Sequence, residues 1–155
     1  MQGTGTSENP YLVKSIAELR EAATISGAYV KVIADLDCNE ENYLEWETLN
    51  ITAKEIDFDG RSLMKPYIKT GNVLFNGSTI KNAKILKVYE NGANAVISNA
   101  RMEHVALTAF LSSIVGAVLD NCTAQECNFI IENKNPKFGW FTMQDPGYKH
   151  CRFLL

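Results

Sequence analysis

The sequence predicts an all-β fold, a parallel β-helix with one short α-helix near its N-terminus. Apolar and polar residues alternate in short segments such as YVKVIADL (29–36), which indicates strands with one buried face. Asp-Gly and Asn-Gly pairs separate these segments at 59–60 and 76–77, as turns do. Similar segments recur in the same order and direction, which favours stacked parallel strands over antiparallel hairpins.

Two strips of sequence carry this recurrence. In the first, FDG at 58–60 recurs as FNG at 75–77, and 80–83 recurs at 97–100 and again at 119–122. Periods of roughly 20 residues mark arrays of one repeated structural unit. Each unit is therefore expected to be one coil of two or three short strands, stacked about 4.8 Å from the next.

The second strip matches 85–88 to 102–105, with the same step as the one from 58–60 to 75–77. It continues with longer steps at 124–127 and then at 148–151. The two strips together predict that the chain pairs with itself in parallel along most of its length.

The repeat also predicts which side chains stack. Phe58 is expected directly above or below Phe75 inside the column, because both occupy the same place in the repeated motif. A second internal stack should hold Leu63, Ile80 and Ile97. The repeated asparagines are expected to form a ladder at one corner, where a left-handed backbone is needed that asparagine tolerates; these are Asn82, Asn99 and Asn121.

A single domain is expected at 155 residues. Residues 1–14 would form an opening segment and the first strand, 15–27 a helix that caps the column, and 28–155 the coils. Ser15 and Glu18 have the spacing of a capping box, and Gly27 would end the helix. The apolar face of that helix would contain Ile16, Leu19, Ala22, Ala23 and Ile25. A peripheral helix without a capping role is the alternative.

These opening residues resemble a known module. GTGTSENPYLVKSIAELREAA (3–23), followed by YVKVIADLDCN (29–39) and Trp46, is similar to the start of β-helix proteins of bacteriophages and bacterial surfaces. The stretches IDFDGRSL (56–63) and STIKNAKI (78–85) resemble the coils that follow in that module. The resemblance implies a right-handed, pectate-lyase-like parallel β-helix.

The resemblance also implies a function. In phages the module builds spikes, fibres and head-decoration proteins, often as trimers. We therefore expect a non-enzymatic virion structural protein, assembled in the host cytoplasm and attached to capsid or tail proteins. Host surface glycans are a further candidate partner. A bacterial surface adhesin is disfavoured by an N-terminus without an apolar export segment.

The alternative is a carbohydrate-active enzyme, a polysaccharide lyase or a glycoside hydrolase on the same scaffold. Such enzymes need clustered carboxylates on adjacent coils, and lyases also need Ca²⁺ and a basic residue. Asp57 and Asp59 are expected on one outward face, but the repeat aligns them with Leu74 and Asn76 of the next unit. Asp35 and Asp37 are expected to orient turns. The acids are therefore not expected to converge, and neither catalytic residues nor a cofactor are predicted.

Histidines and cysteines give no clear site. His104, Glu126 and His150 take equivalent places in the second strip, so they should form an exposed polar stripe, with a metal site as the less favoured alternative. The four cysteines, Cys38, Cys122, Cys127 and Cys151, lack zinc-site spacing. Buried reduced thiols are expected.

Composition excludes two classes of partner. The net charge is −3 without a basic block, so nucleic acid is not expected. The longest apolar run, 105–119, contains three hydroxyl residues and is too short for the roughly 30 Å of a bilayer core, so membrane insertion is not expected.

Aromatic and apolar residues near the C-terminus predict assembly. The FGWF stretch, with Phe138, Trp140 and Phe141, is expected to lie at a subunit interface, with core packing or glycan contact as alternatives. Phe153, Leu154 and Leu155 end the sequence as an apolar strand whose edge needs cover, either from a continuing chain or from another subunit. Together with the resemblance, these residues predict a homotrimer.

Overall fold

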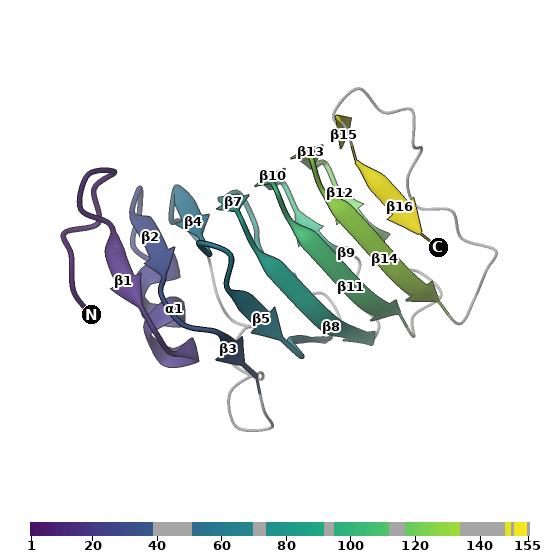
Figure 1. Cartoon of the computed structure of the whole chain (residues 1–155), viewed down its shortest axis with the longest axis horizontal. Helices are drawn as coiled ribbons and strands as arrows, with labels where there is room; N and C mark the ends of the chain where they lie inside the picture. Colours follow the sequence, from purple (N-terminus) through teal and green to yellow (C-terminus); the bar gives the residue numbers. More distant parts are fainter. Residues whose placement is uncertain are drawn as a thin grey trace.

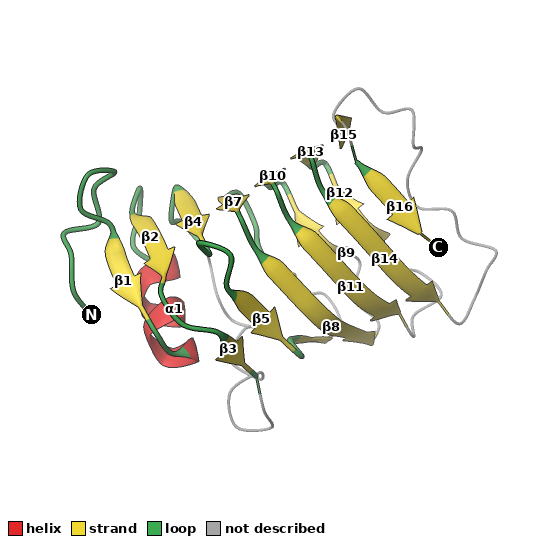
Figure 2. Ribbon diagram, viewed as in Figure 1, coloured by secondary structure: helices red, strands yellow, loops and turns green. Residues whose placement is uncertain are grey.

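The computed structural model describes residues 1–38, 51–69, 74–91, 95–111, 117–133, 148–149 and 151–154. The chain winds into a column whose rungs follow one another from the N-terminal end to the C-terminal end (Figure 1). Strands make up most of the described regular structure, with a single helix near the N-terminus (Figure 2). Among the described strands every pairing is parallel. The predicted all-β parallel β-helix with its short helix is confirmed.

The elements follow in this order: β1 (Tyr11–Val13), α1 (Ile16–Ala23), β2 (Tyr29–Val32), β3 (Leu36–Asp37), β4 (Glu55–Asp57), β5 (Ser62–Met64), β6 (Tyr67–Lys69), β7 (Thr79–Lys81), β8 (Lys84–Asn91), β9 (Ala95–Ser98), β10 (Arg101–Glu103), β11 (Ala106–Leu111), β12 (Ala117–Asp120), β13 (Thr123–Gln125), β14 (Asn128–Asn133), β15 (Tyr148–Lys149) and β16 (Arg152–Leu154).

Three sheets run along the column. Sheet A stacks β1, β2, β4, β7, β10, β13 and β15; sheet B stacks β3, β5, β8, β11, β14 and β16, with β6 beside β8. Sheet C holds β9 and β12. The chain passes from a strand of sheet A around a corner into a strand of sheet B, and then returns to sheet A one rung further on.

The core consists of inward residues that repeat from rung to rung. In sheet A, Ile56 pairs with Ile80, Ile80 with Met102, and Met102 with Ala124, all of them buried. Each of these pairings joins one rung to the next. In each of them the two paired residues are further apart in the sequence than the matched motifs at 58–60 and 75–77. The longer steps of the second strip, to 124–127 and 148–151, are therefore true rungs, whereas its step from 85–88 to 102–105 is not.

Of the predicted internal stacks, only the burial and the contact of Phe58 and Phe75 are confirmed, because Phe58 bonds to Lys81 and Phe75 to Ser98 and the two are not equivalent positions of adjacent rungs. Phe58 and Phe75 are both fully buried, and their rings meet edge to face with centroids 6.3 Å apart. Leu63, Ile80 and Ile97 do not form one stack, because they lie in sheets B, A and C respectively.

The short step of the repeat therefore compares different corners of the coil. Gly60 and Gly77 both have positive φ, at 79° and 93°, which glycine adopts without steric cost. One turn follows β4 and the other precedes β7, so the shared motif reports shared turn chemistry and not shared position.

An asparagine ladder is present, but it contains Asn76 in place of the predicted Asn82. The Asn121 side-chain amide donates to Asn99 at 2.8 Å, and the Asn99 amide donates to Asn76 at 3.0 Å. Asn82 has the predicted left-handed backbone, with φ of 51°, but it lies at the corner after β7 and donates to Asp57 instead. The expected ladder of Asn82, Asn99 and Asn121 is wrong in that residue, since Asn82 belongs to another corner.

Helix α1 follows β1 in the chain. In the later coils the strand of sheet A is followed instead by a strand of sheet B. The Ser15 hydroxyl accepts from the Glu18 amide at 3.1 Å, and the Glu18 carboxylate accepts from the Lys14 amide at 2.7 Å. The helix ends at Ala23, before the expected Gly27. Its buried residues are Ile16, Leu19, Ala22 and Ala23, as predicted, so it closes the core at this end of the column.

The first ten residues cover the edge of β1. The Leu12 amide donates to the Gln2 carbonyl at 2.8 Å, and the Tyr29 amide donates to the Gly5 carbonyl at 2.9 Å. Gly3 has φ of 102°, and a Cβ there would lie 2.0 Å from the Pro10 carbonyl oxygen. Glycine is therefore required for both backbone conformation and space.

We expect Gly3→Ala to open this cover. Gly77→Ala is the matched control, because Gly77 has a similar φ of 93° but nothing within 4 Å of a built Cβ. The control should lose about 1–2 kcal/mol of stability from backbone strain alone, without a local opening at β1. In Gly3→Ala the Leu12 amide should exchange with solvent much faster than in the parent chain. Unchanged protection of Leu12 would contradict this role of Gly3.

Candidate functional site

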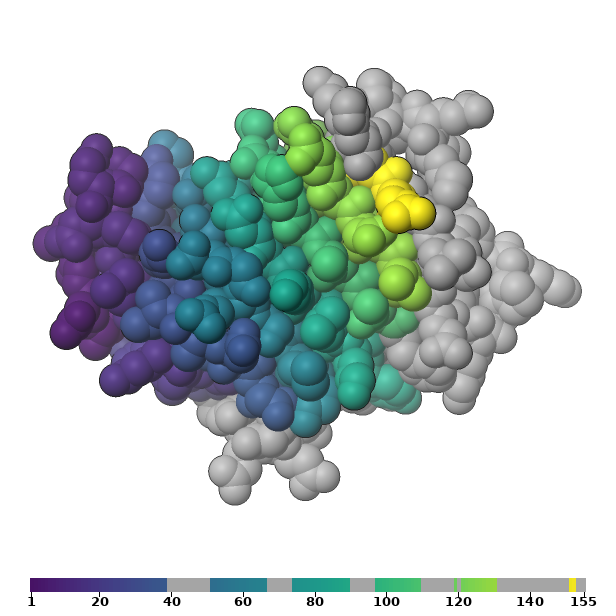
Figure 3. Space-filling view, in the orientation of Figure 1, coloured from purple at the N-terminus to yellow at the C-terminus, as the bar shows by residue number. Residues whose placement is uncertain are grey.

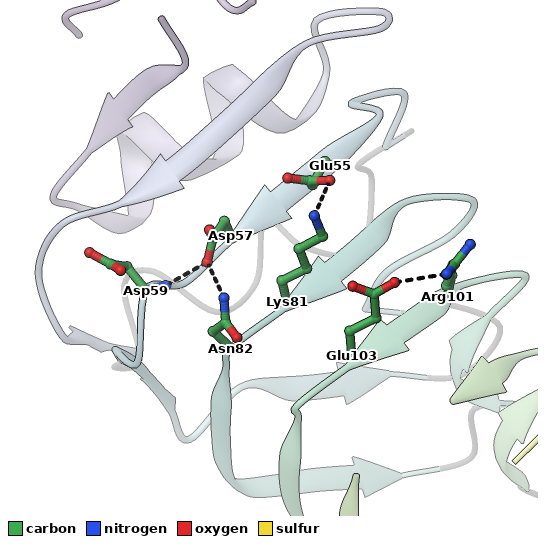
Figure 4. A network of polar contacts seen from close by, with 7 residues as sticks. All are labelled: Glu55, Asp57, Asp59, Lys81, Asn82, Arg101 and Glu103. Carbon is green, nitrogen blue, oxygen red and sulfur yellow. Dashed lines mark hydrogen bonds and ion pairs between the residues drawn. The ribbon is translucent and has the colours of Figure 1, made fainter. Parts of the chain in front are cut away.

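The outer face of sheet A carries a network of charged and polar side chains (Figure 4). One row across successive rungs reads Lys31, Asp57, Lys81, Glu103 and Gln125, each in register with the next. From Lys31 to Glu103 the charges alternate in sign from one rung to the next. Opposite charges placed directly across a strand pair are stabilising and like charges are not, so the row neutralises itself.

Ion pairs tie this face together. Lys81 Nζ lies 2.8 Å from Glu55 Oε2, and Arg101 Nη2 lies 2.9 Å from Glu103 Oε1 (Figure 4). The bond to the Glu55 carboxylate raises the pKa of Lys81 and outweighs the opposing effect of partial burial. Such half-exposed pairs contribute roughly 0.2–1 kcal/mol each, so they select the register more than they hold the fold.

Asp57 has a structural task at the corner that follows β4. Its Oδ1 atom accepts the Asp59 amide at 2.8 Å and the Asn82 side-chain amide at 3.0 Å (Figure 4). Asp57 therefore shapes the turn of its own rung and joins it to the corner of the next rung.

The sequence suggested that Asp57 and Asp59 share one outward strand face. The structure shows that they do not. Asp59 lies in the turn with φ of 48°, and its carboxylate is 3.3 Å from Lys31 Nζ. The strand geometry of alternating faces ends at Asp57, so a spacing of two residues no longer aligns the two carboxylates.

Asp35 and Asp37 hold neighbouring coils together, in keeping with the prediction that they orient turns. Asp35 Oδ1 accepts the Ser62 amide at 2.9 Å, and this hydrogen bond lowers the pKa of the Asp35 carboxyl below its ordinary value of 3.8. Asp37 pairs with Lys65 at 2.9 Å. The left-handed φ of Lys65, 57°, marks the corner where this pair lies.

The first two residues of the predicted polar stripe, His104 and Glu126, lie next to each other at the corner after sheet A. His104 Nδ1 and Glu126 Oε2 are 3.0 Å apart, both side chains are about half exposed, and both backbones are left-handed. His150 lies outside the described residues. Within the described part of the chain, no three histidine, cysteine or acidic side chains gather closely enough to hold a metal ion.

Three of the four cysteines are buried, as predicted, and Cys151 is half-buried. The Cys122 thiol donates to the Ile97 carbonyl at 3.5 Å, and the Cys127 thiol donates to the Gln125 carbonyl at 3.2 Å. Burial raises the pKa of Cys127 to about 11. A thiol with so high a pKa is a poor nucleophile at neutral pH.

The residues predicted at a subunit interface are mostly not placed by the structure. Phe138, Trp140, Phe141 and Leu155 lie outside the described residues, as does Trp46 of the resembling module. Phe153 and Leu154 belong to β16, where the backbone pairs with Phe129 and Ile130 of β14.

Sequence reasoning missed three apolar side chains on the outer face of sheet B. Met64 and Leu86 are in register and half-buried, and Ile130, 45% exposed, is in register with Thr108 of β11. In the space-filling view the described rungs, coloured from purple to green, follow one another as one continuous surface (Figure 3). β8 carries one extra residue here, since Leu86 and Lys87 lie opposite the single Thr108, and this irregularity interrupts the simple alternation along β8.

Comparisons with protein-family models, curated protein sequences and solved structures find no match to this chain. In the described residues there is also no helix with the length and apolar character needed to cross a bilayer.

The bond between Asp35 and Ser62 predicts a pH dependence. Because the folded pKa of Asp35 lies below 3.8, its stabilising effect is complete above that pH and is lost as the pH falls through the folded value. Asp35→Asn should therefore be less stable than the parent at pH 7, with the difference vanishing in strong acid. Thermal unfolding from pH 7 downward measures this. A difference in stability between Asp35→Asn and the parent that stays constant from pH 7 into strong acid would contradict the assignment.

Proposed function

We propose that the chain is a non-enzymatic structural module of a bacteriophage virion, of the pectate-lyase-like type that builds spikes, fibres or head decorations. It would assemble in the host cytoplasm and attach to capsid or tail proteins. The observation that carries this proposal is the use of its outward acids. Glu55, Asp57, Asp59 and Glu103 each bind a cation or a backbone or side-chain donor of the scaffold.

The construction of the column supports a mechanical role. Each rung donates backbone hydrogen bonds to the next, and apolar residues stack continuously through the core. Close-packed protein interiors resist deformation. A stiff rod with a closed N-terminal end is what a fibre or spike requires, whereas catalysis requires polar groups that are still available to a substrate.

A carbohydrate-active enzyme remains the second candidate, on one specific observation. Asp57 on β4 and Glu103 on β10 lie in register on the same outer face, two rungs apart. Two rungs span about 9.6 Å, close to the upper limit of the carboxylate spacing in inverting glycosidases, roughly 6.5–9.5 Å. Asp57 accepts two hydrogen bonds from the scaffold and Glu103 pairs with Arg101, which weighs against this role.

Incubation with acidic polysaccharides separates the two candidates. We expect neither unsaturated uronates nor new reducing ends from polygalacturonate, pectin or capsular polysaccharides. Glu103→Gln and Asp57→Asn are the diagnostic variants, and Thr123→Ala, on the same face without a charge, is the matched control. Product formation that disappears in either acid variant but persists in the control would establish an enzyme and end the structural proposal.

We further propose that the module is a homotrimer. Met64, Leu86 and Ile130 are apolar side chains on the outer face of sheet B, the last of them exposed, and exposed apolar patches on otherwise polar proteins usually mark a partner. Closed cyclic symmetry is the common arrangement of identical chains. Phe138, Trp140, Phe141, Phe153, Leu154 and Leu155 are the residues predicted near these contacts, and host glycans would be bound, if at all, by the assembled trimer.

Sedimentation equilibrium should give three times the chain mass at micromolar concentration. Ile130→Lys should weaken trimer formation about tenfold or more if Ile130 is a central contact. Thr123→Lys adds the same charge to the same rung but on sheet A, and it should leave the trimer intact. A parent chain that remains monomeric, with Trp140 freely quenched by iodide, would contradict the assembly.

A further inference from the structure

Two of the cysteines occupy one corner position on adjacent rungs. Cys127 lies between β13 and β14, and Cys151 lies between β15 and β16. The residues on both sides are in register, since Gln125 pairs with Lys149 and Asn128 with Arg152. The Arg152 amide donates to the Cys127 carbonyl at 2.9 Å, which fixes the two backbones side by side.

This geometry is compatible with a disulfide. Neighbouring strands lie about 4.8 Å apart, within the roughly 4.4–6.8 Å that separates the Cα atoms of disulfide-bonded cysteines. The two thiols are also in hydrogen-bonding contact. The equivalent corner positions on the preceding rungs hold Ala83 and Val105, both buried, so the thiols occur together only where the last described rung joins the column.

The two thiols differ in accessibility. Cys127 is 2% exposed, whereas Cys151 is only partly buried and packs against the edge of the core. A small reactant can therefore reach Cys151 first, and the buried Cys127 lies directly beside it. The other two cysteines lie at different corners of the coil, Cys38 after β3 and Cys122 after β12.

We propose that Cys127 and Cys151 form a thiol–disulfide redox site, which reacts with small disulfides such as glutathione disulfide and closes a covalent link between the last two rungs. The link would hold β15 and β16 to β13 and β14. This site requires only the fold, and it is independent of the virion role proposed above.

The reaction balances in two exchange steps. The Cys151 thiolate attacks one sulfur of glutathione disulfide, so a mixed disulfide forms and one glutathione leaves. The Cys127 thiolate then attacks the Cys151 sulfur, the protein disulfide forms, and the second glutathione leaves. The two protein thiols lose two electrons and two protons, and glutathione disulfide is reduced to two molecules of glutathione.

Burial sets the speed of the second step. The raised pKa of Cys127, about 11, leaves little thiolate at neutral pH, and only the thiolate attacks. Ring closure should therefore be slow at pH 7 and should accelerate about tenfold for each pH unit between 7 and 9. An exposed thiol of ordinary pKa would show a smaller increase over the same range.

The test uses the full chain with Cys38→Ala and Cys122→Ala, so that only the pair remains, alongside the parent chain. After treatment with glutathione disulfide and denaturing alkylation, mass spectrometry should find both thiols lost and no glutathione retained. Peptide mapping should then join Cys127 to Cys151, and a reductant should reverse the change. Exchange of the Arg152 backbone amide should slow by about tenfold or more, because the link restrains opening of the last rung.

Cys127→Val is the matched control, because valine fills the same corner one rung earlier, at Val105. In this variant Cys151 should take up one glutathione and keep it. A stable glutathione adduct in the chain that retains both cysteines, a disulfide between separate chains, or two unreacted thiols would each overturn the proposal. The parent chain gives the same readouts, so a variant that fails to fold leaves the outcome decidable.

Discussion

In-register parallel stacking is the constraint on which the rest of this structure depends. Each inward position meets its own equivalent one rung away, so a residue type that fits once must fit repeatedly, as Ile56, Ile80 and Met102 do in sheet A. Outside, the same rule would place like charges against each other about every 4.8 Å. The alternation of Lys31, Asp57, Lys81 and Glu103 avoids this repulsion, and it leaves these acids bound to the scaffold.

Corners carry the conformational cost of this stacking. Eight described residues other than glycine have positive φ, a conformation that costs roughly 1–2 kcal/mol for most side chains. Bonds across rungs offset part of this cost: Asn99 joins Asn76, Asn121 joins Asn99, and Glu126 pairs with His104. A polar residue at a corner is therefore explained by the corner itself before any ligand needs to be invoked.

Sequence alone predicted the fold class, the start of helix α1, its buried face and the left-handed asparagines, because these depend on local chemistry. It failed where register decides. Phe58-Asp59-Gly60 and Phe75-Asn76-Gly77 look alike because both form glycine turns, yet they lie at different corners, so the step between them gave a wrong period. Similarly, the bond of Asn82 to Asp57 and the ion pair of Lys81 with Glu55 follow from which rungs adjoin, which no local pattern encodes. The outward apolar residues of sheet B were hidden by the extra residue in β8 at Leu86 and Lys87.

The glycines near the N-terminus are explained by how the first residues cover the end of the column, and a ligand-binding role is not needed to account for them. A glycine-rich segment next to a helix could suggest an anion-binding loop. Here Gly3 lies against the Pro10 carbonyl, and Gly5 lies against the Tyr11 ring, so the absence of side chains serves close packing. The amides of Leu12 and Tyr29 are bonded to the carbonyls of Gln2 and Gly5. The segment supplies the pairing that the edge of β1 would otherwise offer to another chain, and growth of the sheet at this end is thereby prevented.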